Sequence, residues 1–247
     1  MKLRKPIKRH HIPSIFTLIN MFLGFLAVIS IVEGVYIRAA YLIAAAGIFD
    51  VIDGKLARKI EMPSRFGAEL DSLADLISFC LAPALLVWAL YAQDLHPILG
   101  ALVAGSPLLF GAMRLARFNL LTGEGPKPYY EGLPSPIAAY LVVALVIYYE
   151  TQGHAGAGKV VLPMVMATSF LMVSQVKYGK FPTASLHMGA MNTLRLVSAI
   201  GTMTIFFLVD TRVLLPMVIF YLVSGLVRHL SRTPAEVEDI PATESKV

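Results

Sequence analysis

The sequence predicts an all-α polytopic membrane protein, a bundle of about eight transmembrane helices. Of the 247 residues, 57% are hydrophobic and only 15% are charged, whereas soluble domains have about 25% charged residues. The mean hydropathy is +0.70. Apolar runs long enough to cross roughly 30 Å of hydrocarbon recur along the chain. This composition excludes an ordinary soluble domain.

The N-terminal residues 1–13, MKLRKPIKRHHIP, form a basic segment. We expect it to lie against the cytoplasmic leaflet and its anionic lipids, so the net charge of +5 does not indicate nucleic acid. The apolar stretch that follows is interrupted by Asn20 and Gly24 and has no small-residue cleavage site. It therefore predicts a retained first span. The single cysteine, Cys80, excludes an intrachain disulfide.

The predicted spans end where charged and turn residues interrupt the apolar runs. Residues 14–230 are expected to form one transmembrane domain, followed by a disordered, polar cytoplasmic tail at 231–247. The spans within this domain are predicted at 14–33, 36–56, 71–92, 95–117, 134–150, 158–176, 193–209 and 212–229.

The basic residues predict the orientation of these spans. With the N-terminus inside, all but three of the 21 lysines and arginines fall on the inner side, and the exceptions are Arg38, Lys159 and Arg212. Such an asymmetry is expected when an even number of spans leaves both termini in the cytoplasm. It brings the inner ends of the second and third spans to the same membrane surface.

Two pairs of aspartates mark these inner ends. Asp50 and Asp53 are three residues apart, and Asp71 and Asp75 are four apart. On a helix, each pair falls within about 60° of one face. Four carboxylates beside lipid-like sequence carry a large desolvation cost unless a cation lies among them. Divalent cations take oxygen ligands and often share them with phosphates, so the pattern predicts metal-dependent phosphoryl chemistry.

The aspartates belong to a longer motif, Asp50-x-x-Asp53-Gly54-x-x-Ala57-Arg58, then eight residues, then Gly67-x-x-x-Asp71-x-x-x-Asp75. This motif resembles the signature of the CDP-alcohol phosphotransferases, with no position substituted. The resemblance implies that a hydroxyl attacks the β-phosphorus of a CDP-linked lipid and that CMP leaves. The bland alternative is that the aspartates form ion pairs at helix ends.

The resemblance also implies roles for individual residues. Asp50, Asp53 and Asp71 are expected to bind Mg²⁺ or Mn²⁺, two ions per site, with Asp75 as the general base or as a fourth ligand. Small residues such as Gly100, Ala104 and Gly111 would permit close helix approach in the homodimer that the family implies. The nucleotide-lipid, CDP-diacylglycerol, is expected to contact Asn20, Asp50, Gly54, Ala57, Arg58 and Gly67.

A second set of motifs bears on the acceptor alcohol. Arg114-Leu-Ala-Arg117-Phe-Asn119, Gly132-Leu-Pro-Ser-Pro136 and SQVKYGKF at 174–181 resemble elements of phosphatidylserine synthases of the same family type. The resemblance implies L-serine as acceptor. An arginine fork suits a carboxylate, so Arg114 or Arg117 is expected to bind that of serine, and Asn119 its ammonium group.

Other interpretations remain open at this stage. The two arginines could instead face lipid phosphates and only orient their helix. The acceptor could be that of a phosphatidylglycerophosphate or phosphatidylcholine synthase. A transporter or a catalytically silent bundle is the alternative of another class, although the sequence has no internal repeat of the kind many transporters show.

Overall fold

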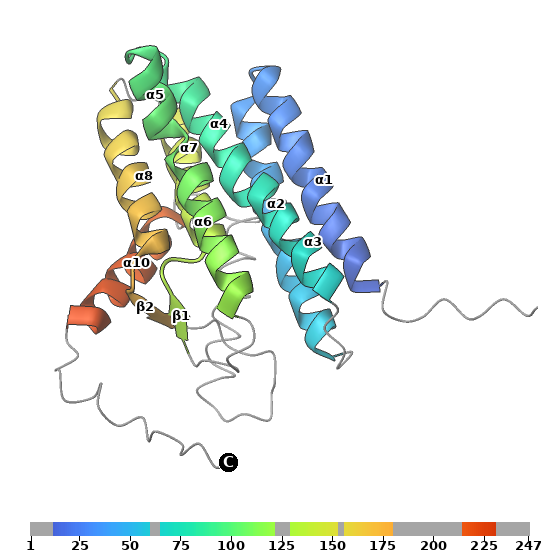
Figure 1. Ribbon diagram of the computed structural model, residues 1–247. Coiled ribbons are helices and arrows are strands. Elements are labelled where there is room, and N and C mark those ends of the chain that lie inside the picture. The colour runs from blue at the N-terminus through green and yellow to red at the C-terminus, as the bar shows by residue number, and fades with distance from the viewer. Residues whose placement is uncertain (1–11, 60–64, 122–128, 153–155, 180–213, 231–247) are drawn as a thin grey trace, which may run out of the picture.

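The computed structural model describes residues 12–59, 65–121, 129–152, 156–179 and 214–230. Most of these residues are helical, and the helices pack side by side in one bundle (Figure 1). A single long helix, from Arg65 to Ala92, contains two wider π-helical turns. The elements are α1 (Ile12–Val32), α2 (Tyr36–Lys59), α3 (Arg65–Asp75), η2 (Leu76–Leu81), α4 (Ala82–Val87), η3 (Trp88–Ala92), α5 (Pro97–Ala104), α6 (Ser106–Leu121), β1 (Tyr129–Glu131), α7 (Ser135–Gln152), α8 (Gly158–Val173), β2 (Lys177–Gly179) and α10 (Leu214–Leu230).

The predicted spans that fall within the described residues lie on helices whose ends differ from the predicted ones by at most six residues, and the predicted span 95–117 corresponds to two consecutive helices, α5 and α6. The predicted span 193–209 and the tail 231–247 lie outside the described residues, as does almost all of the basic segment 1–13. The helices themselves could be predicted because long apolar runs are interrupted by charged or turn residues.

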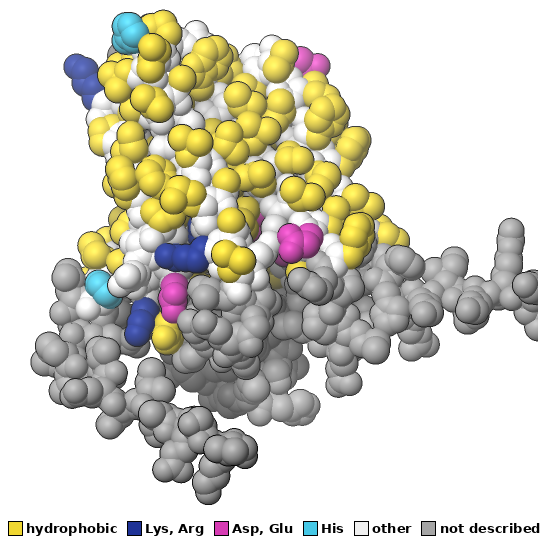
Figure 2. Space-filling model, in the orientation of Figure 1, with side chains coloured by type: hydrophobic (Ala, Val, Ile, Leu, Met, Phe, Trp, Pro, Cys, Tyr) yellow, Lys and Arg dark blue, Asp and Glu magenta, His cyan; other side chains and the backbone are white. Residues whose placement is uncertain are grey.

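Within the described residues, three helices are long and apolar enough to cross a membrane: Ile15–Val32, Phe66–Ala92 and Pro97–Leu120. Shorter apolar helices cover Ser135–Thr151, Gly158–Val173 and Leu214–Val227. On the face shown in Figure 2, hydrophobic side chains cover the sides of the bundle, and charged side chains appear toward its two ends. These are the features of an integral membrane protein.

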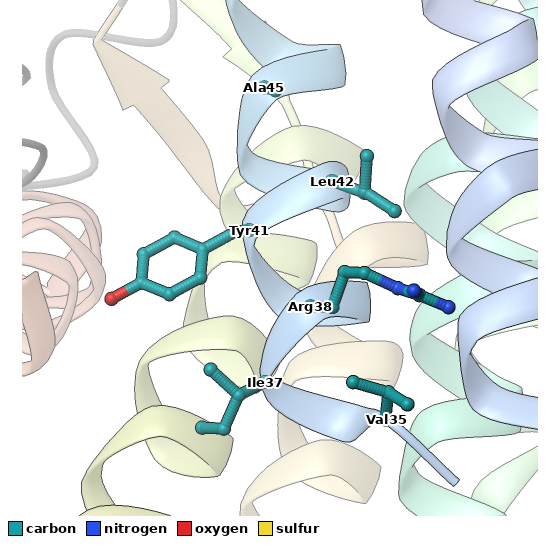
Figure 3. Close-up of a pocket in the computed structure, with 6 residues that line it drawn as sticks. All are labelled: Val35, Ile37, Arg38, Tyr41, Leu42 and Ala45. Carbon is teal, nitrogen blue, oxygen red and sulfur yellow. The ribbon is translucent and has the colours of Figure 1, made fainter. Parts of the chain in front are cut away.

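The turn between α1 and α2 closes a helical hairpin. Gly34 has a φ of 75°, and Arg38 pairs with Glu33 while its Nε donates to the Ser30 hydroxyl at 2.9 Å. An open groove of about 670 Å³ follows the exposed side of α2 here, lined by Val35, Ile37, Arg38, Tyr41, Leu42 and Ala45 (Figure 3). It contains no carboxylate and lies at the opposite end of α2 from Asp50 and Asp53, so it is not the predicted site.

The long helix widens at η2 for a reason visible in the sequence. Pro83 has no N–H, and its ring conflicts with the carbonyl of the residue four positions earlier in a regular α-helix. Just before it, the Ala82 N–H bonds to the Ile77 carbonyl, five residues back, which is the π-helical spacing. The wider turn accommodates the proline without breaking the helix, directly after Asp75.

A two-stranded antiparallel sheet corrects the all-α prediction. β1 and β2 pair with Tyr130 opposite Tyr178, and the ring of Tyr178 stacks on Tyr221 of α10 with 5.7 Å between centroids. Burial raises the pKa of the Tyr178 hydroxyl. Each strand has three residues, too few to show an alternating pattern, and the partners are far apart in the sequence. This is why the sequence pattern did not predict them.

Candidate metal and acceptor site

Three of the predicted metal ligands meet between α2 and α3. Asp50, Asp53 and Asp71 each offer a carboxylate oxygen, and these oxygens all lie within 4.8 Å of one another. Asp53 is buried, and the other two are half-buried. Such a set of oxygen donors fits a hard divalent cation such as Mg²⁺ or Mn²⁺. It is also too crowded with negative charge to be stable in a buried position without a cation.

The helices place these groups by helical spacing and by packing on α1. Asp50 and Asp53 stand on one face of α2 because they are three residues apart, and Asp71 follows Gly67 by one turn in α3. The Phe16 and Phe49 rings, 6.4 Å apart, hold α1 against α2 just before the first aspartate. Gly54 is half-buried near the end of α2. Ala57 and Arg58 lie in the last turns of α2, where the side chains are outside the described residues.

Asp75 lies one turn beyond Asp71, at the end of α3, and is outside the group of three carboxylates. Its Oδ1 is buried and has no hydrogen-bond partner among the described residues. Its charge interacts with those of Asp50, Asp71 and Asp53, and also with that of Arg114. Asp75 therefore interacts both with the carboxylate cluster and with a buried cation from another helix.

The two arginines that the sequence could not separate have different surroundings. Arg114 on α6 is buried, its Nη1 donates to the Ser135 hydroxyl at 3.1 Å, and its Nε has no partner in the described part of the chain. Arg117 instead donates to two backbone carbonyls, those of Val173 and Glu131, both at 3.2 Å. Arg114 is thus available to a ligand, whereas Arg117 ties α6 to the segments that carry the small sheet.

Asn119 joins α6 to α3. Its Nδ2 donates to Glu69 Oε2 at 3.2 Å, and its Oδ1 accepts from the Ser72 hydroxyl at 3.2 Å. Both ends of the amide that we expected to bind the ammonium group are therefore engaged with the helix that carries Asp71 and Asp75. This arrangement favours a role in holding the two helices together.

Asn20 is a buried polar group of α1, the helix that packs against α2 and α3. Its side chain is fully buried, and neither Oδ1 nor Nδ2 has a hydrogen-bond partner among the described residues. Its backbone carbonyl accepts from the Ser78 hydroxyl at 2.9 Å, and a Cβ on Gly24 would lie 2.4 Å from the same hydroxyl. The tight packing of α1 on η2 thus fixes a buried amide whose hydrogen-bonding groups are unsatisfied among the described residues.

The small residues that we expected at a dimer face are used inside the chain. A Cβ on Gly111 would lie 2.3 Å from Cys80 Sγ, and one on Gly100 would lie 2.6 Å from the Ala92 carbonyl. Ala104 is 1% exposed. These residues allow α5 and α6 to pack closely on their neighbours, so that interpretation of them was wrong.

Sequence reasoning did not assign Ser135 or Tyr130 to the site. Ser135 accepts the bond from Arg114, and Tyr130 interacts electrostatically with the same arginine. The signal available was the Gly132-Leu-Pro-Ser-Pro136 motif, which marks the start of α7 but does not say what its serine contacts.

A family model described as CDP-alcohol phosphatidyltransferase matches residues 10–225. The chain is similar to a CDP-diacylglycerol–serine O-phosphatidyltransferase of Helicobacter pylori, at 35% identity over 68% of this chain and 72% of that protein. It is 33% identical to the Bacillus subtilis protein of the same name, over 70% of this chain and 92% of that one. An archaetidylserine synthase of Methanothermobacter thermautotrophicus is 35% identical over 68% of this chain and 69% of its own length.

The matched region contains every helix described above except the last five residues of α10, and it includes all four aspartates. The resemblance read from the motif is therefore confirmed: the chain belongs to the CDP-alcohol phosphatidyltransferase family.

Proposed function

We propose that this chain transfers the phosphatidyl group of CDP-diacylglycerol to the hydroxyl of L-serine, giving phosphatidylserine and CMP. The observation that carries the proposal is that Asp75 interacts both with a metal-binding set of carboxylates and with the buried Arg114. The relatives support the acceptor, because the bacterial enzymes and the archaeal one carry serine in their names while their lipids differ.

The metal site is Asp50, Asp53 and Asp71, and we propose two divalent ions per site, Mg²⁺ or Mn²⁺. When bound, they neutralise the pyrophosphate of the donor and the charge that develops on the departing phosphate of CMP. The protein's part is to hold three oxygens in place on two rigid helices, so that little reorganisation is needed when the donor binds.

Asp75 is the proposed base. Its buried Oδ1 has no hydrogen-bond partner among the described residues, so it is open to the proton of the acceptor hydroxyl. As that proton moves to Oδ1, the serine oxygen bonds to the phosphorus that bears the lipid. The bond from this phosphorus to the bridging oxygen breaks, and CMP leaves with that oxygen.

We assign the acceptor and donor contacts as follows. Arg114 holds the serine carboxylate. Arg117 and Asn119 bond to neighbouring segments of the chain, so we assign them a structural role in which they do not contact the acceptor. Asn20, Gly54 and Gly67 border the nucleotide, with Ala57 and Arg58 completing that side by analogy with the family motif. Asn20 is the best supported of these, because its buried amide lacks a partner in the described structure.

The topology is part of the proposal. Eight spans with both termini in the cytoplasm would place the site at the cytoplasmic ends of the second and third helices, where serine and the nucleotide are available. The distribution of lysine and arginine supports this orientation. The family's homodimer is proposed as well, without an assigned interface.

The test is CMP release from purified protein given CDP-diacylglycerol, Mg²⁺ or Mn²⁺ and one alcohol at a time. We expect release with L-serine and little with glycerol 3-phosphate or choline. Release of CMP with glycerol 3-phosphate but not with serine would show that serine is not the acceptor, and only the assignment to the family would remain. Absence of release with every alcohol would overturn the catalytic assignment.

A further inference from the structure

Ser135 is a buried hydroxyl for which the reaction described above has no role. It is the first residue of α7, it is fully buried, and its Oγ accepts from Arg114 Nη1 at 3.1 Å. A serine at this place could cap its own helix, but its hydroxyl instead contacts the arginine of a different helix.

The segment before Ser135 is fixed with little freedom. The Gly132 N–H donates to the Val176 carbonyl and the Leu133 N–H to the Leu171 carbonyl, both at 2.9 Å. Gly132 has a φ of 77°, and a Cβ there would lie 2.2 Å from the Met172 carbonyl oxygen. Arg117 anchors the neighbouring Glu131 carbonyl. Ser135 is therefore presented to Arg114 from a rigid support.

This contact decides which edge of the guanidinium is open. The group is planar and can bind a carboxylate through Nε and Nη2 on one edge or through Nη1 and Nη2 on the other. One of the two N–H groups of Nη1 donates to Ser135, whereas Nε has no partner among the described residues, so the edge containing Nε is the one that this contact leaves to a ligand.

Arg114 bonds to Ser135 and does not form an ion pair with Asp75 in the described part of the chain. Opposite charges in a low-dielectric interior attract strongly, and these two interact while forming no ion pair among the described residues. If Arg114 lost its bond to Ser135, the carboxylate of Asp75 would be a partner of opposite charge for it. That pairing would occupy both the proton acceptor and the cation on which the acceptor depends.

We propose that Ser135 is a positioning residue for acceptor recognition, holding Arg114 so that its Nε edge meets the carboxylate of an amino-acid acceptor beside Asp75. The proposal rests on the proposed function and deepens it, because it names how the acceptor is selected. Ser135 acts through Arg114 and touches no reacting atom.

The experiment compares Ser135→Ala with Ser169→Ala. Ser169 is also a buried serine, on α8, and its hydroxyl bonds to Ser106 Oγ at 3.0 Å and to the Val165 carbonyl at 2.8 Å rather than to Arg114. Ser135→Ala should raise the apparent KM for L-serine roughly tenfold, with the KM for CDP-diacylglycerol changed less than about twofold. Ser169→Ala should leave the serine KM unchanged.

Serinol, which lacks the carboxylate, gives a second readout. The preference of the wild type for serine over serinol should fall in Ser135→Ala and persist in Ser169→Ala. Ser135→Cys, close in volume but a weak acceptor, should behave like Ser135→Ala and replaces it if that variant does not fold. An unchanged serine KM in the folded variant, or an equal rise in both KM values, would overturn the proposal.

A double-mutant cycle with Arg114→Lys isolates the coupling. Since Lys has no Nε edge to orient, adding Ser135→Ala to Arg114→Lys should raise the serine KM less than about twofold further. Full additivity of the two substitutions would contradict a role through Arg114. Failure of the proposed function is distinguishable, because the wild type itself would then release no CMP with serine.

Discussion

Asp75 on α3 and Arg114 on α6 are opposite charges with buried polar atoms that interact across the bundle, yet no ion pair joins them in the described structure. Asp75 Oδ1 and Arg114 Nε both lack a hydrogen-bond partner among the described residues. A separated pair of this kind is costly in an empty protein. It matches an acceptor that carries a hydroxyl at one end and a carboxylate at the other.

The first prediction concerns the metal. Asp71→Asn should lower the rate roughly a hundredfold or more and raise the Mg²⁺ concentration needed for half-maximal activity, because one of three oxygen ligands is weakened. Glu69→Gln is the matched control, since Glu69 is on the same helix but outside the cluster. EDTA should abolish CMP release by the wild type, and near-normal turnover in EDTA would refute the metal assignment.

The second prediction separates Asp75 from the ligands. Asp75→Asn should also lower the rate roughly a hundredfold, because an amide cannot take the hydroxyl proton. It should leave the Mg²⁺ requirement near that of the wild type, in contrast to Asp71→Asn. A large increase in the Mg²⁺ requirement of Asp75→Asn would instead identify Asp75 as a fourth ligand.

The third prediction distinguishes the two arginines. Arg114→Ala should raise the serine KM by roughly ten- to a hundredfold, the worth of one charged contact. Arg117→Ala should mainly lower the melting temperature, because it loses its bonds to the carbonyls of Val173 and Glu131. The measurements are steady-state kinetics and thermal unfolding in mild detergent, and the opposite pattern would exchange the two roles.

The fourth prediction concerns orientation. Cysteines placed by Glu61→Cys and Glu124→Cys should react with a membrane-impermeant thiol reagent only from the cytoplasmic side, and one placed by Gln152→Cys only from outside. The native Cys80 is buried and should give little background. Labelling of all three positions from one face would be incompatible with the eight-span layout.

The fifth prediction uses two glycines with similar backbone angles. Gly132 and Gly156 have φ of 77° and 82°. A Cβ on Gly132 would lie 2.2 Å from the Met172 carbonyl oxygen, whereas a Cβ on Gly156 would meet no described atom within 4 Å. Gly156→Ala should cost about 1 kcal/mol of backbone strain. Gly132→Ala should cost roughly 3 kcal/mol or more, since backbone must also move. Thermal unfolding measures both, and equal losses would contradict the packing described.

The metal cluster could be predicted from the sequence because its geometry is local. The spacings of Asp50 with Asp53 and of Asp71 with Asp75 fix helical faces, and one short connection brings the two helices together. The apolar runs predicted the helices for the same reason, since length and hydrophobicity are properties of each segment alone.

The rest depended on contacts between distant segments. Nothing near Arg117 indicates that its partners are the carbonyls of Glu131 and Val173, and nothing near Ser135 indicates Arg114. The motifs associate Arg114, Arg117 and Ser135 with the acceptor, but they do not show which of these residues bind a ligand and which support the others. Backbone carbonyls, the partners of Arg117, leave no trace in a side-chain pattern.

The π-helical turn at Leu76–Leu81 has a consequence for how the long helix can change. A π turn holds one more residue than an α-helical turn of the same rise, so it sets the rotation of everything beyond it relative to Asp71 and Asp75. The part of the helix that carries Asp71 and Asp75 and the part beyond the turn can therefore be rotated independently of each other. A single-residue insertion or deletion at this turn would rotate the part of the helix beyond it, where Leu86 and Val87 are buried in the bundle, while leaving the carboxylates in register.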